Sequence, residues 1–328
     1  MKHQRLPYRA ASAAALAVVA IILLALAGEG ASGQTRPIKI INPFPPGGTA
    51  DIIARLMADQ IGRTRGATMV IEDHPGAGSV IGAEFVARAA PDGNTLLIGT
   101  SAIMINAYLH KTNYDTVKSF EPICNLTQSP QLIFVNSESP YRTVADIVAA
   151  ARGKPGEVSI ASTGPGTTSH IAIEMLKRTA KVDITYVPYP GNAPTVNATL
   201  GGHVTAGIAN YADVAQHFKA GKLRPIVIFP PTRIEPLPDV PTMVEAGYPD
   251  SQFVLWFGMF APARTPKDLI SQYSGWFAEA LKVPEVKDKL IGQGLYPVGA
   301  CGADFAAAFS KENGDIGRVI REANIKVE

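Results

Sequence analysis

The stretch that decides the fold reads IKIINPFPPGGTADIIARLM and covers residues 38–57. It opens with an apolar β-rich run, is interrupted by prolines and two glycines, and continues with apolar residues at helical spacing, including Ile53 and Met57. This order of strand, glycine loop and helix is the first part of a β-α-β unit. Because the strand is apolar on both faces, the unit predicts a parallel sheet covered by helices on both sides.

The same unit recurs along the chain. Residues 69–71 and 95–98 read as further strands, and the pattern starts again after residue 140. There a strand at 158–161 precedes a second glycine loop and a helix over 169–180. A chain of 328 residues exceeds what one hydrophobic core usually organises, so one such unit in each half predicts two lobes.

The proline-rich passage 230–249 is interpreted as a return between the lobes. Lobe 1 is therefore predicted to be discontinuous and lobe 2 inserted into it. The predicted boundaries are residues 34–138 and 233–328 for lobe 1, and residues 139–232 for lobe 2.

Composition excludes several classes of protein. Hydrophobic residues make up 46% of the chain and charged residues 18%, which is typical of a packed globular protein and not of a disordered one. Thirty lysines and arginines against 28 acidic residues leave a net charge of +2. Since no basic run accompanies this balance, nucleic acid is not an expected partner.

The N-terminal segment resembles a secretory signal. Lys2, Arg5 and Arg9 precede an apolar run from Ala10 to Ala27, and small residues follow at suitable cleavage positions. We expect residues 1–33 to be a signal peptide and the mature protein to be periplasmic. A retained membrane anchor is the alternative, since the run approaches spanning length, and the exact cleavage site stays open.

Cys124 and Cys301 are the only cysteines. In an oxidising compartment they could pair, but their separation in sequence does not determine their distance in space. Cys124 lies in an apolar, strand-like stretch, so a buried free thiol is at least as plausible an expectation.

The two glycine loops can act as anion sites. A helix N-terminus presents unpaired backbone N–H groups and the positive end of the helix dipole, and glycine allows a ligand to approach closely. Neither loop contains lysine or arginine, so N–H groups, water and hydroxyls would hold an acidic ligand. The candidate hydroxyls are Thr49, Ser162, Thr163, Thr167 and Ser169. The alternative is that each loop is an ordinary turn.

Signals for cofactors, metals and catalysis are missing from the sequence. Gly47-Gly48-Thr49 lacks the lysine of a phosphate-binding Walker loop, and the Gly164–Ser169 segment lacks the third glycine of a dinucleotide fingerprint. The six histidines form no zinc-binding pair on a helix, and no nucleophile elbow is present. We expect His170, next to Ser169, to hydrogen-bond locally. The sequence predicts no cofactor, no metal and no enzyme.

Several motifs together resemble the Bug family, the extracytoplasmic receptors of tripartite tricarboxylate transporters. The motifs are PFPPGGTAD at 43–51, HPGAG at 74–78, APDGNTLL at 90–97, STGPGTTSH at 162–170 and LPDVPT at 237–242, with WFG at 256–258. The resemblance covers essentially the whole mature chain. It implies a type II periplasmic-binding-protein fold, a small mono- or dicarboxylate ligand, and membrane transporter components as partners of a monomeric receptor.

The resemblance also implies ligand contacts on both lobes. In lobe 1 they are Phe44, Pro46, Gly47, Gly48, Thr49, Asp51, Thr100 and Ser101. In lobe 2 they are Ser162, Thr163, Gly164, Gly166, Thr167, Ser169, His170 and Asn210. Trp256, with Phe257 beside it, would either flank the ligand where its strand crosses the cleft or belong to the core.

Departures from the family pattern leave the identity of the ligand undetermined. Asp73 and His74 stand where many members have asparagine and arginine, and Asn192 follows Gly191 where glycine is common. The ligand of a relative therefore cannot be transferred to this chain. Two other functions are consistent with the sequence: a sensory binding protein without a transporter, and an α/β hydrolase-like enzyme.

Overall fold

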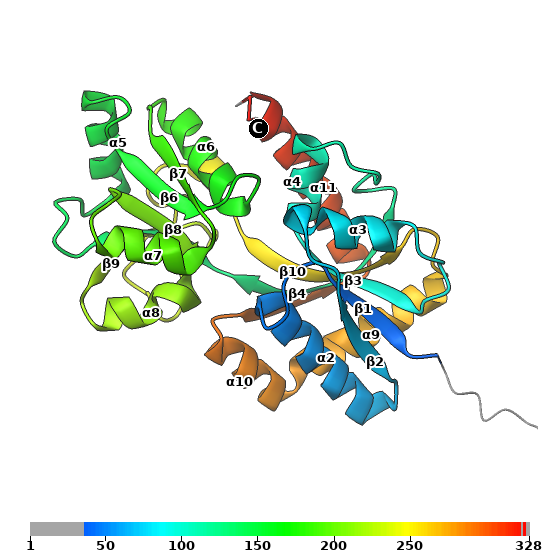
Figure 1. Cartoon of the computed structure of the whole chain (residues 1–328). Coiled ribbons are helices and arrows are strands. Elements are labelled where there is room, and N and C mark those ends of the chain that lie inside the picture. Colours follow the sequence, from blue (N-terminus) through cyan, green and yellow to red (C-terminus); the bar gives the residue numbers. More distant parts are fainter. Residues whose placement is uncertain (1–35, 323, 326–328) are drawn as a thin grey trace, which may run out of the picture. The chain divides into compact units, whose positions relative to one another are not determined.

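The computed structural model describes residues 36–322, 324 and 325 (Figure 1). The expected signal peptide, residues 1–33, lies outside the described residues. From Pro37 onward the chain forms one compact unit that contains two β-sheets. We call the first sheet with its helices lobe 1 and the second sheet with its helices lobe 2. Among the described residues, no helix combines the length and hydropathy that a membrane span requires.

Lobe 1 is built on a six-stranded sheet in the order β11-β4-β10-β3-β1-β2. Its strands are β1 (Ile38–Asn42), β2 (Met69–Asp73), β3 (Thr95–Thr100), β4 (Phe120–Ser129), β10 (Leu255–Pro262) and β11 (Tyr296–Cys301). The predicted parallel pairing holds for β1 with β2 and β3. In contrast, β10 runs antiparallel to β3 and β4, and β11 antiparallel to β4. The reversal arises because β10 enters this sheet from the other lobe and not through a β-α-β crossover.

Lobe 2 is built on a five-stranded sheet in the order β7-β6-β8-β5-β9. Its strands are β5 (Gln131–Asn136), β6 (Ser159–Thr163), β7 (Thr185–Tyr189), β8 (Ala206–Asn210) and β9 (Leu223–Ile228). We expected residues up to 138 to belong to lobe 1, whereas β5 pairs with β8 and β9. The second sheet therefore begins at Gln131, directly after Pro130. The chain returns to lobe 1 through residues 229–254, which include the short 3₁₀ helix η2 (Pro249–Ser251).

Helices cover both faces of each sheet (Figure 1). In lobe 1, α2 (Thr49–Arg65), α9 (Lys267–Lys282) and α10 (Pro284–Gly292) share one core cluster. The other face carries η1 (Ala77–Ser79), α3 (Val80–Ala87), α4 (Ala102–Leu109) and α11 (Ala303–Glu322). In lobe 2, α5 (Val144–Gly153) and α6 (Thr168–Ala180) lie on one face, with α7 (Asn192–Leu200) and α8 (Tyr211–Lys219) on the other.

The buried face of α2 shows why these helices form where they do. Ile53, Met57 and Ile61 recur at intervals of four residues and are fully buried. One apolar stripe therefore faces the sheet, while Arg63 and Arg65 lie in the last turn, where cations interact favourably with the helix dipole. Gly66 ends the helix in a left-handed conformation, which glycine adopts without steric cost.

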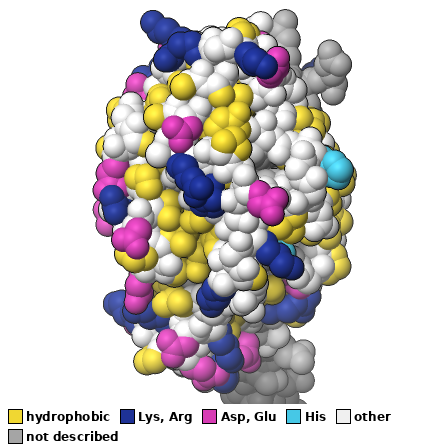
Figure 2. Space-filling model, turned by 90° about the vertical axis from the view of Figure 1, so that its left-hand side faces the viewer, with side chains coloured by type: hydrophobic (Ala, Val, Ile, Leu, Met, Phe, Trp, Pro, Cys, Tyr) yellow, Lys and Arg dark blue, Asp and Glu magenta, His cyan; other side chains and the backbone are white. Residues whose placement is uncertain are grey.

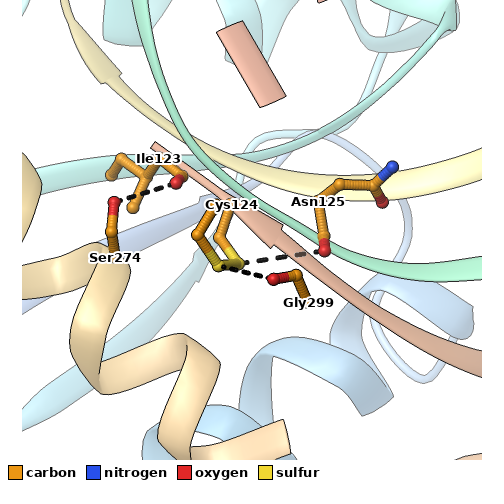
Figure 3. Close-up of a disulfide and its surroundings, with 6 residues drawn as sticks. Ile123, Cys124, Asn125, Ser274 and Gly299 are labelled. Atoms are coloured by element: carbon orange, nitrogen blue, oxygen red, sulfur yellow. Dashed lines mark hydrogen bonds between the residues drawn. A yellow bond between two sulfur atoms is a disulfide. The ribbon is translucent and has the colours of Figure 1, made fainter. Parts of the chain in front are cut away.

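The question of the two cysteines is settled by the sheet. Cys124 on β4 lies in register with Cys301 on the edge strand β11, and the two form a disulfide (Figure 3). Next to it, Ser274 of α9 donates a hydrogen bond to the Ile123 carbonyl at 3.0 Å. A buried free thiol at Cys124 was the wrong alternative, because it was judged without knowing that the last strand of the sheet pairs with β4.

The viewed face of the molecule carries positive and negative side chains that are interspersed, with apolar side chains between them (Figure 2). Many charged residues of the described chain form local ion pairs, such as Lys154 with Glu157 and Lys289 with Glu285. Such exposed pairs contribute little stability.

Candidate ligand-binding site

A cavity of about 260 Å³ lies between the two lobes. Residues of both lobes line it, and most of them stand where a strand ends or a helix begins. The lining residues are Phe44, Thr49, Ala50, Thr100, Ala102, Gln131, Thr163, Thr167, Thr168, Asn192, Asn210, Leu255 and Phe257. None of these side chains is ionisable.

Five helices direct their N-termini at this cavity. Lining residues occupy the N-cap or the first turn of α2, α4, α6, α7 and α8. The first-turn N–H groups of a helix have no intrahelical partner, and the helix dipole makes them electropositive. Five such ends around a cavity without a charged side chain favour a small anion bound through N–H groups and hydroxyls.

The first glycine loop is held by Asp51 from within α2. The Gly47 N–H donates to the Asp51 carboxylate at 2.9 Å, and Arg55 pairs with the same carboxylate at 2.8 Å. Asp51 is buried and does not line the cavity, so its contact with the Gly47 N–H shapes the loop. Pro46, Gly47 and Gly48 also form the loop without lining the cavity, whereas Phe44 and Thr49 line it as expected.

The end of β3 contributes through Thr100. Its hydroxyl accepts a hydrogen bond from the Ala102 N–H at 3.1 Å at the start of α4, and both residues line the cavity. Ser101 is fully buried and does not line it. Within the described part of the chain, the Ser101 hydroxyl has no hydrogen-bond partner.

The second glycine loop is fixed by hydroxyl groups. The Thr167 hydroxyl donates to the carbonyl of Thr163 or Gly164, each at 2.8 Å, and caps α6. The hydroxyls of Thr163 and Ser169 lie 2.9 Å apart. Thr163 and Thr167 line the cavity, as does Thr168, whereas Ser169 supports them from behind. The loop is therefore rigid, with its threonine side chains toward the cavity.

His170 and Gly166 form a hydrogen bond with each other and do not line the cavity. The Gly166 N–H donates to His170 Nδ1 at 3.3 Å, and the imidazole stacks on Tyr186 with ring centroids 4.3 Å apart. Burial lowers the pKa of His170, which keeps the ring neutral and able to accept this bond. Gly164 and Ser162 are likewise engaged inside lobe 2, by the Tyr189 carbonyl and the Thr163 carbonyl.

A chain of amides forms the lobe 2 side of the cavity. Thr168 donates to Gln131 Oε1, and Gln131 Nε2 donates to Asn210 Oδ1, both at 3.2 Å. Asn192 donates to Asp213 at 2.6 Å. Asn210 was expected here, but Gln131, Thr168 and Asn192 were missed. The polar Gln131 between Pro130 and an apolar run was a signal that could have revealed a crossover residue.

Trp256 belongs to the core and not to the cavity. Side chains alternate along β10, so Leu255 and Phe257 line the cavity while Trp256 points to the opposite face of the sheet. There it packs edge-on against Phe305 and donates from Nε1 to Glu312 at 2.8 Å. Of the two alternatives for Trp256, the structure therefore favours the core, and Phe257 lines the cavity in its place.

The Trp256–Glu312 contact predicts a pH-dependent stability. Burial raises the pKa of Glu312 to about 7. Because the folded protein favours the protonated form of Glu312, this carboxyl contributes to the free energy of unfolding. The contribution is complete below the ordinary carboxyl pKa and is lost as the pH rises through 7. Glu312→Gln keeps an acceptor for Trp256 without a charge. It should raise the unfolding free energy near pH 8 by about 1–3 kcal/mol relative to the wild type.

Urea unfolding at about pH 5 and about pH 8 measures this effect. Asp304→Asn, at an exposed carboxylate of the same helix, is the matched control and should leave the difference between the two pH values unchanged. An unchanged pH dependence in Glu312→Gln would contradict the assignment.

Over residues 36–322, 324 and 325, no group of three or more histidine, cysteine, aspartate or glutamate side chains could hold a metal ion. His170, the residue next to Ser169, is committed to Gly166.

Comparisons with known proteins show the family of the chain. Residues 53–325 match the family described as tripartite tricarboxylate transporter family receptor. The chain is similar to the protein BugT of Bordetella pertussis, at 32% identity over 321 residues that cover 95% of this chain and 98% of BugT.

Solved structures show the same two-lobed α/β fold, which confirms the expected periplasmic-binding-protein architecture. A Rhodopseudomonas palustris protein solved with adipate is 31% identical, with a TM-score of 0.77, covering 90% of this chain and 99% of that chain. MatC of the same organism, solved with bound malate, is 29% identical, with a TM-score of 0.73, covering 88% and 99%.

Proposed function

Because the chain belongs to the family of tripartite tricarboxylate transporter receptors, we propose that it captures a small carboxylate between its lobes and delivers it to membrane components of such a transporter. The observation that carries the proposal is the cavity into which five helices direct their N-termini without any charged side chain. Related proteins solved with adipate and malate support a carboxylate as the ligand.

Members of this family are solute-binding receptors and not enzymes, which confirms the expectation that the chain is not an enzyme. The hydrolase-like alternative is therefore set aside. The periplasmic location and the transporter partners remain part of the proposal, supported by the family and by the signal-like pattern of residues 1–33. Recovery of the protein from the periplasmic fraction, with its N-terminus between Gly28 and Gln34, tests the location.

Binding through N–H groups and hydroxyls has a simple physical basis. A carboxylate in the cavity accepts hydrogen bonds from groups that the fold already directs toward it, so little reorganisation is needed on binding. Enclosure between the lobes removes water, which strengthens these charge-assisted bonds. Thr49 and Thr163 supply hydroxyls beside the helix N-termini, whereas the Thr167 hydroxyl hydrogen is donated to a carbonyl of its own loop.

A ligand panel tests the proposal. Carboxylic acids and their neutral amides should be compared at neutral pH, because the two differ mainly in charge. A bound acid at about a hundred times its Kd should stabilise the fold by roughly 2.7 kcal/mol, visible as a higher melting temperature. The matched amide should give no comparable shift. The proposal would be overturned if acids and their amides stabilised the fold equally. It would also be overturned if no acid in the panel stabilised it.

A further inference from the structure

The cavity wall is divided by lobe. All six lining residues of lobe 2 carry a polar hydroxyl or amide side chain. Of the seven lining residues of lobe 1, only Thr49 and Thr100 are polar. The cavity therefore has a polar wall, formed by the lobe 2 residues, and a largely apolar wall, formed by the lobe 1 residues.

The apolar wall consists of large side chains that are packed against the lobe 1 core. Phe257 is 5% exposed and belongs to the lobe 1 core, and Phe44 and Leu255 pack against that core. These side chains come from β10 and from the loop after β1, which the sheet holds in place. The surface they present to the cavity can be removed from water only by an apolar part of a ligand.

The polar wall supplies donors. Asn210 Oδ1 accepts from Gln131, and Gln131 Oε1 accepts from Thr168, so these two amide oxygens are engaged. Among the described residues, the buried Asn192 Oδ1 has no hydrogen-bond partner. The amide NH₂ groups retain N–H donors, and the N-termini of α6, α7 and α8 add electropositive backbone groups on the same side. One carboxylate placed on this wall meets donors from several elements.

Resting on the proposed function, we infer that the ligand is an amphipathic monocarboxylate. Its carboxylate binds the lobe 2 wall, and its hydrocarbon body packs on Phe44, Leu255 and Phe257. A second carboxylate placed against Phe44, Leu255 and Phe257 would lose its hydration and gain no hydrogen bond from these side chains. Donors on the lobe 1 side are confined to the N-termini of α2 and α4, with Thr49 and Thr100. The cavity of about 260 Å³ has the volume of roughly nine water molecules, so the hydrocarbon body is short.

Hexanoate and adipate form a matched pair that tests this inference, because they share one carbon chain and differ by one carboxylate. Calorimetry should show hexanoate binding at least about tenfold more tightly than adipate, with malate weaker still. Adipate or malate binding as tightly as hexanoate would overturn the inference while leaving the proposed function intact. If no carboxylate binds, the proposed function fails as well, so the two failures are distinguishable.

Leu255→Thr tests the apolar wall directly. Threonine suits a strand and removes apolar surface at the cavity, so hexanoate should bind about fivefold more weakly. The matched control is Ile52→Thr, an equivalent loss of an exposed apolar side chain on α2 outside the cavity lining, and it should leave hexanoate affinity unchanged. Unliganded melting of both variants establishes that they are folded. Equal hexanoate affinity in Leu255→Thr and the wild type would contradict the apolar wall.

Discussion

Gly166→Val should weaken carboxylate binding by about a hundredfold, equivalent to roughly 2.7 kcal/mol. Gly166 has a φ of +73°, a conformation that β-branched side chains rarely adopt. A Cβ at this position would point at Asn106 Oδ1 and Leu109 Cδ1, each 3.5 Å away. Both atoms belong to α4 of lobe 1, so the larger valine side chain would hold the lobes apart.

This explanation differs from the one that the sequence suggested. Gly166 was expected to leave room for a carboxylate to reach the backbone amides. In the structure its N–H is bound by His170, and the space left by its missing side chain is occupied by lobe 1. Asn106 is itself held there by a hydrogen bond to the Gly78 carbonyl at 2.6 Å. Gly166 thus allows the two lobes to meet.

Variants at neighbouring positions separate backbone strain from the obstruction of lobe contact. A Cβ at Gly164, in the same loop, meets nothing within 4 Å and has no positive φ, so Gly164→Val should bind nearly as the wild type does. Gly166→Ala keeps the strained backbone but makes only ordinary contacts, so its loss should be intermediate. Calorimetry with a bound acid measures the affinity of each variant. The melting temperature without ligand measures how far the strained backbone destabilises the fold. Wild-type affinity in Gly166→Val would refute the role of this contact.

Removing the Cys124–Cys301 disulfide should lower the free energy of unfolding by about 2–5 kcal/mol. The bridge joins residues that are 177 apart in sequence, and the enclosed segment contains all of lobe 2. Cross-linking so long a segment restricts the unfolded chain strongly, while the folded sheet already holds β4 beside β11. The effect should therefore be on stability and not on the geometry of the cavity.

The double variant Cys124→Ala/Cys301→Ala, compared with the wild type in urea with and without reductant, measures this contribution. Reductant should destabilise the wild type and leave the double variant unchanged, which serves as the control. Neither cysteine lines the cavity, so ligand affinity of the folded double variant should match that of the wild type. Coincident unfolding curves for oxidised and reduced wild-type protein would show that the bridge contributes nothing.

Local sequence determined the elements that surround the cavity. An apolar run, a glycine loop and a helical stripe depend on neighbouring residues alone, so β1 with α2, and β6 with α6, could be predicted. The same reasoning located Thr49, Thr163 and Thr167, because hydroxyl residues beside a helix start lie at the carboxyl end of the preceding strand.

Tertiary structure decided which side of each element meets the cavity. Whether Trp256 or Phe257 faces it depends on the strands that flank β10, since a change of one residue in strand register exchanges the two faces. Gln131 reaches the cavity because β5 crosses into the second sheet, and Cys124 reaches Cys301 because β11 returns beside β4. The role of Gly166 depends on Asn106, which is 60 residues away in the sequence. Asn106 lies on α4, a helix of the other lobe. These are contacts between distant segments, and periodicity along a single segment carries no information about them.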